Sequence, residues 1–253
     1  MSGPLAELRG DCRAIWSDAD VRRAAFEELV HAAAMGGDRL ARALARIDGA
    51  VVEGLERLAL PRGPIRGVVQ TNNPNVLGRK DPSCTFEINS IYIARFLRGP
   101  RGTDSILRTW VHESLHGRRP YAEGHLAEYR RAPGYEEGLA EGLAQIVARR
   151  YGGLDPPSGA YDYYAAVYRS LASSMDIEIE QLLRALWRSP TGRVRHALPL
   201  VMDNLRRTGG YPPMTGAQLR MLQARADTMF DQSRGLLVPN ELTMEMVWKT
   251  VLR

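Results

Sequence analysis

The most informative stretch of this 253-residue chain is Thr109-Trp-Val-His112-Glu113-Ser-Leu-His116. Residues four apart on an α-helix lie one turn above each other, so a helix here places both imidazoles on one face. Glu113 is rotated by about 100° from His112 on such a helix. An apolar stripe covers the other side: Leu107, Val111 and Leu115. The spacing therefore predicts a helix that buries one face and presents its two histidines together.

Two imidazoles one turn apart can bind one metal ion, and the His-Glu-x-x-His spacing is a zinc signature. A catalytic zinc site takes three protein ligands and keeps its fourth position for water. Cys12 and Cys84 are the only cysteines and lie far apart, so thiolates are not expected among the ligands. The third ligand is therefore expected to be a histidine or a carboxylate.

The best source of a third ligand is the segment Tyr135-Glu136-Glu137-Gly138-Leu-Ala-Glu141-Gly142, which follows Pro133-Gly134 and begins another predicted helix. Glu137 and Glu141 are one turn apart and share a face of that helix. The small residues of the segment would let it approach the histidine-bearing helix closely. Rival third ligands stay open: His125, Glu136, Glu141 and Asp162.

Together, the two segments resemble the gluzincin branch of the zinc metallopeptidases, over about residues 85–148. The resemblance implies that His112, His116 and Glu137 bind Zn²⁺ and that Glu113 is the catalytic base. It also implies that Glu141 orients a ligand histidine through the other ring nitrogen. The expected activity is that of a peptidase: zinc activates a water, and Glu113 takes its proton and passes it to the leaving amine.

An oxyanion stabiliser is a further expectation, because zincins usually add a Tyr, His or Arg for this purpose. The sequence does not choose among the candidates, which are Tyr161, Tyr163, Tyr164, Tyr168 and His196. The tyrosines also fit ordinary packing on an amphipathic helix. A peptide substrate could pair with the predicted strand Phe86–Ile93, provided that this strand lies at a sheet edge.

The expected fold class is α+β and predominantly helical, with a zincin-like core that combines a small antiparallel sheet and the active-site helix. Its predicted strands are Ile65–Gln70 and Thr85–Ile93, joined by a loop over Thr71–Ser83. Helices are predicted on both sides of this region. Those after Thr103 are interrupted at Gly- and Pro-containing segments: 117–133, 152–158, 189–190, 209–213 and 235–240. Residues 1–62 are expected to form an N-terminal helical region, a candidate docking module, and residues 63–253 the catalytic domain.

Composition and charge bear on the cellular location of the protein but do not identify a binding partner. The net charge of +5 comes from arginines spread along the chain, and Lys80 and Lys249 are the only lysines. The N-terminal residues reach charges before any apolar run, and no apolar stretch has the ~20 residues of a membrane helix. We therefore expect a cytoplasmic protein with no membrane partner. The resemblance to gluzincins implies a peptide or protein substrate.

Two other functional classes stay open beside the peptidase. The metal site could serve stability alone, in a non-catalytic structural or interaction protein. The arginine content also permits a nucleic-acid-associated metalloprotein, which ranks third because no basic cluster is interleaved with aromatic residues. The sequence does not indicate the cleavage preference or the oligomeric state.

Overall fold

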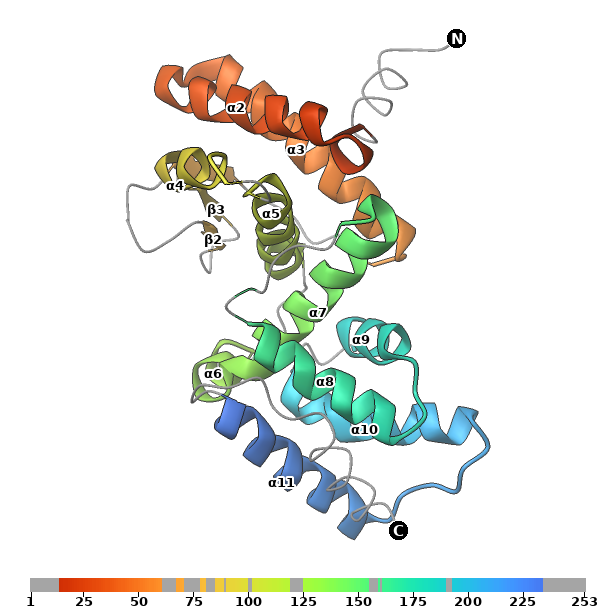
Figure 1. The fold of residues 1–253 in the computed structure, drawn as a ribbon. Coiled ribbons are helices and arrows are strands. Elements are labelled where there is room, and N and C mark those ends of the chain that lie inside the picture. Colours follow the sequence, from red (N-terminus) through yellow and green to blue (C-terminus); the bar gives the residue numbers. More distant parts are fainter. Residues whose placement is uncertain are drawn as a thin grey trace. The chain divides into compact units, whose positions relative to one another are not determined.

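The computed structural model describes residues 14–60, 67–70, 78–80, 85–88, 90–99, 102–118, 125–154, 159, 161–189 and 193–233. Helices dominate these residues (Figure 1). In chain order they are α2 (Ala19–Met35), α3 (Gly37–Arg57), α4 (Ser90–Phe96), α5 (Gly102–Arg118), α6 (His125–Arg131), α7 (Pro133–Gly152), α8 (Asp162–Ser174), α9 (Ile179–Trp187), α10 (Val194–Thr208) and α11 (Gly216–Ser233). None of the helices described here is both long and apolar enough to cross a membrane.

Three short strands form one mixed sheet, in the order β1-β3-β2. They are β1 (Gly67–Gln70), β2 (Gly78–Lys80) and β3 (Thr85–Ile88). β1 runs parallel to β3, whereas β2 runs antiparallel to it. The expected fold class, with its zincin-like core and small antiparallel sheet, is therefore wrong, since the two predicted strands pair in parallel. The reason is that β2 lies inside the predicted loop and forms the antiparallel hairpin with β3, which leaves β1 for the other edge of β3.

The second predicted strand was also too long. β3 ends at Ile88, and α4 occupies most of the remainder of the predicted strand. Ile93 and Leu97, four residues apart, are both buried, which is the spacing of a helix face. β3 pairs on both sides within the described sheet, so the expectation that it offers a free edge to a peptide is wrong.

The chain divides into two compact units, of which the first contains Met1–Arg118 and Ala144–Pro157. Asp18 caps α2 by accepting hydrogen bonds from the backbone N–H groups of Asp20 and Val21. α2 packs against α3, α4 and α5, and α5 packs against β2 and β3. The N-terminal helices and α5 thus share one core. That residues 1–62 act as a docking module stays a prediction.

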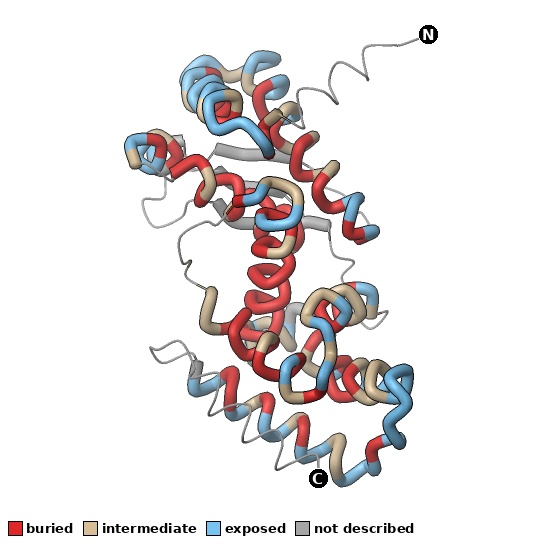
Figure 2. Tube along the Cα trace, turned by 45° about the vertical axis from the view of Figure 1, so that its right-hand side comes forward, coloured by how far each residue is buried: buried red, intermediate tan, exposed pale blue. Residues whose placement is uncertain are grey.

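The second unit contains Arg119–Leu143 and Ser158–Arg253. Its core brings the aromatic rings of Tyr135 and Tyr168 against Phe230, at centroid distances of 4.0 and 5.2 Å. α7 is one continuous helix. Its residues up to Leu143 belong to this unit, and those from Ala144 onward belong to the first unit. Figure 2 colours most of α7 as buried. The predicted break at 235–240 lies outside the described residues.

Candidate metal centre

α5 carries the His-Glu-x-x-His motif with the predicted burial. Leu107, Val111 and Leu115 are completely buried, which confirms the apolar stripe. His112 is only 3% exposed. Glu113 and His116 are half-buried. The helix therefore holds the His112 imidazole in the interior, while Glu113 and His116 keep partial access to solvent.

The two rings point their Nε2 atoms at each other, with 3.1 Å between them. A hydrogen bond from a protonated to an unprotonated Nε2 would give this separation. It is also close to the value of about 3.3 Å between two ligand nitrogens of a tetrahedral zinc ion with ordinary Zn–N bonds. The side chains are thus already placed as two ligands of one ion would be.

α7 contributes three buried carboxylates, those of Glu136, Glu137 and Glu141, each 6% exposed or less. Buried carboxylates in proteins are generally paired or bound to metal ions, because an isolated charge in the interior is costly. The hydroxyl of Tyr129 on α6 donates a hydrogen bond to Oε1 of Glu137. Tyr129 was missed in the sequence because it lies in the predicted break at 117–133, where the short helix α6 forms.

Among the described residues, one group of His, Cys, Asp and Glu side chains could hold a metal ion: His112, His116 and Glu137. One ligand atom from each lies within 4.8 Å of the others. These are the three ligands expected from the sequence. Their donor set of two nitrogens and one carboxylate oxygen fits Zn²⁺ chemically.

The alternative candidates for the third ligand lie outside this group of three residues. Glu136 and Glu141 are buried on α7 beside the proposed ligand. The carboxylate of Asp162 accepts a hydrogen bond of 2.9 Å from the backbone N–H of Gly159, at the start of α8. The side chain of His125 lies outside the described residues.

The tyrosines predicted as oxyanion candidates all lie on or next to α8. Tyr168 is fully buried, and its hydroxyl donates a 2.8 Å hydrogen bond to the backbone oxygen of Tyr135. Tyr164 is also buried, whereas Tyr161 and Tyr163 are half-buried. The remaining candidate, His196, is exposed at the first turn of α10. The assignment of an oxyanion role to any of the five stays a prediction.

The first turn of α7 is fixed by a charged network that the sequence did not indicate. Tyr135, next to Glu136, donates a 2.8 Å hydrogen bond to Oδ1 of Asp227, and Arg195 donates to both oxygens of the same carboxylate at 2.8 and 2.6 Å. Burial, and then the Asp227 charge, raise the pKa of Tyr135 far above its ordinary value, so the phenol stays protonated. Burial alone would raise the pKa of Asp227, but the hydrogen bonds from Arg195 and Tyr135 hold it below its ordinary value. Asp227 therefore stays anionic and anchors the turn that precedes Glu137.

Comparison with known protein families, curated proteins and solved structures finds no match to this chain. Function must therefore be inferred from the residues of the site themselves.

Proposed function

We propose that this protein is a zinc-dependent metallohydrolase, and specifically a peptidase, in which His112, His116 and Glu137 hold the metal ion. The observation that carries the proposal is the 3.1 Å approach of the two Nε2 atoms on α5, with a carboxylate oxygen of Glu137 in the same three-residue group. The order of these residues in the chain supports it, because it is the order expected from the resemblance to gluzincins.

Zinc in this site would supply a Lewis acid that polarises the scissile carbonyl and makes water a stronger acid. Glu113 follows His112 on α5 and is half-buried, so its carboxylate can meet both the site and solvent. We assign to it the removal of a proton from the attacking water and the delivery of that proton to the leaving amine. Glu141 lies one helical turn after Glu137 and is 3% exposed. Its proposed role is to accept a hydrogen bond from a ligand histidine and so fix the ring.

Metal content tests the site directly. We expect about one zinc per wild-type chain, as a His₂Glu site requires, and loss of that zinc in His112→Ala. His31→Ala is the matched control, because His31 is an exposed histidine in the middle of α2. Elemental analysis of the three purified proteins gives the result. A wild type that neither contains zinc nor takes it up would overturn the proposal.

Turnover separates a peptidase from a structural zinc protein. Glu113→Gln keeps the size of the side chain but removes the base, so we expect it to retain zinc and lose activity on a peptide library by at least 10²-fold. A zinc-loaded wild type that cleaves no peptide in the library would contradict the peptidase function. In that case, the structural role of the metal would be favoured instead.

A further inference from the structure

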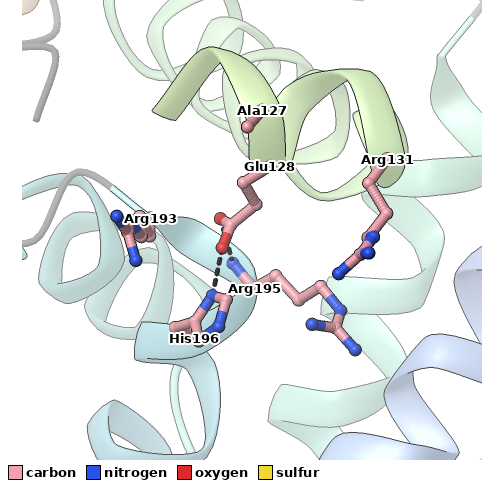
Figure 3. Close-up of a pocket in the computed structure, with 6 residues that line it drawn as sticks. All are labelled: Ala127, Glu128, Arg131, Arg193, Arg195 and His196. Carbon is pink, nitrogen blue, oxygen red and sulfur yellow. Dashed lines mark hydrogen bonds and ion pairs between the residues drawn. The ribbon is translucent and has the colours of Figure 1, made fainter. Parts of the chain in front are cut away.

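A pocket of about 310 Å³ lies in the second unit, where α6 faces the start of α10. This volume is at the lower end of the range of small-molecule sites. Its lining holds more positive than negative side chains (Figure 3): Ala127, Glu128, Arg131, Arg193, Arg195 and His196. Three arginines and one glutamate therefore line this pocket.

The carboxylate of Glu128 is already engaged at one side of this pocket. Its Oε1 accepts a 3.0 Å hydrogen bond from the backbone N–H of Arg195, and its Oε2 pairs with Nδ1 of His196. The Glu128 side chain is 9% exposed. These contacts place the negative charge at the N-terminal turn of α10, where free N–H groups and the helix dipole favour an anion.

Arg195 is also engaged, since both nitrogens that it directs to Asp227 lie within 2.8 Å of that carboxylate. Arg131 differs from it. This exposed side chain has no hydrogen bond or ion pair within the part of the chain that the structure describes. Figure 3 shows Arg131 extending from α6 toward the side of the pocket where the Arg195 side chain lies, away from the carboxylate of Glu128. Arg131 thus lines the pocket without a paired carboxylate among the described residues, whereas the charge of Arg195 is balanced by Asp227.

From this arrangement we infer that the pocket binds the anionic group of a small ligand, a carboxylate or a phosphate, with Arg131 as the principal contact. The planar guanidinium donates two parallel hydrogen bonds to either group, which a point charge would not do. Arg193 lies in the same lining, and Arg195 is held at its edge by Asp227. The engaged carboxylate of Glu128 shows that the start of α10 accepts an acidic group. The inference does not depend on the proposed metal chemistry.

Calorimetric titration at low salt tests the inference with three probes: inorganic phosphate, glutarate and glutaramide. Glutaramide has nearly the shape of glutarate but no charge. We expect the wild type to bind phosphate or glutarate and not glutaramide, and Arg131→Gln to weaken that binding by about tenfold, the loss of one charge-assisted contact. The probe that binds distinguishes a phosphate ligand from a carboxylate ligand.

Arg130→Gln is the matched control. Arg130 precedes Arg131 on α6 and is equally exposed, but it does not line the pocket. Equal weakening in the two variants, or no anion binding by the wild type, would overturn the inference. The same titration of His112→Ala excludes binding of the anion at a metal ion: the inference requires unchanged affinity in that variant, and loss of affinity there would contradict it. The metal proposal is tested separately by zinc content.

Discussion

Tyr129 holds the carboxylate that we propose as the third metal ligand, through its hydrogen bond to Glu137. Contacts of this kind fix the orientation of a ligand, and their loss typically weakens metal affinity by about 10–100-fold. We therefore expect Tyr129→Phe to lower zinc affinity by at least about tenfold, measured by competition with a chelator. Thermal stability of the metal-free protein should change little, because the aromatic ring is kept.

Tyr163→Phe is the control for this experiment. Tyr163 is a half-buried tyrosine on α8 whose ring packs against Tyr164, at a centroid distance of 4.2 Å. Zinc affinity should be unaffected by its loss of a hydroxyl. If Tyr129→Phe instead destabilises the metal-free protein and leaves zinc affinity unchanged, the hydrogen bond supports the fold and not the ligand.

Single residues also show how far the site could be predicted. His112, Glu113 and His116 are set by spacing within one helix, which the sequence displays directly. Tyr129 could not be found in the same way, because its role depends on α6 forming within a segment whose Gly and Pro content predicts a break. The Asp227 network was also hidden, since Tyr135 and Asp227 are 92 residues apart.

At the scale of helices, two glycines let α7 approach its neighbours closely. These glycines are Gly138 and Gly142. The sequence suggested that the small residues of α7 make room for α5, but in the second unit these two glycines face α8 and α9. A Cβ added to Gly138 would lie 2.9 Å from the backbone carbonyl carbon and oxygen of Tyr164. One added to Gly142 would instead lie 2.8 Å from Cδ1 of Leu183, the end of a flexible side chain. The two positions therefore differ in what must move.

This difference predicts opposite effects of the same substitution. Alanine gains about 1 kcal/mol over glycine in helix propensity, whereas overpacking against a rigid neighbour costs about 1–3 kcal/mol. We expect Gly138→Ala to destabilise the protein by about 1–2 kcal/mol. Gly142→Ala should be neutral or slightly stabilising, because Leu183 can rotate. Denaturant unfolding measures the change in the free energy of unfolding for each variant. Equal destabilisation by both substitutions would contradict the difference between a rigid neighbour at Gly138 and a flexible one at Gly142.

For the sheet, the sequence predicts where two strands lie but not how they pair or where the second one ends. The sequence predicts strands that include all of β1 and β3, because short β-branched runs favour extended structure. It does not predict their direction, which depends on β2 pairing with β3 from inside the predicted loop. Nor does it predict the end of β3, because the short segment Ile88–Ile93, with its three isoleucines, fits both a strand and a helix.

At the scale of the whole molecule, the N-terminal helices are tied to the helix that bears the histidines. Arg22 on α2 is 4% exposed. Its guanidinium donates to the backbone oxygens of Ile15 and Trp16, at 3.0 Å each, and to Asp104 in the first turn of α5, at 2.8 Å. Gly54 on α3 also lies close to Val147, in the second half of α7. The sequence boundary at residue 62 therefore falls within one packed unit.

A shortened chain of residues 63–253 tests what this packing contributes. Removal of α2 and α3 would expose apolar surface of α4 and α5 that they cover and leave Asp104 without its arginine. Because hydrophobic burial is the main favourable term in folding, we expect this chain to lose cooperative thermal unfolding and zinc binding. Adding residues 1–62 as a separate peptide should restore part of both. If the shortened chain instead melts cooperatively near the full-length temperature and binds zinc, residues 1–62 are a separable docking module, and their contacts with α5 contribute little to holding His112 and His116.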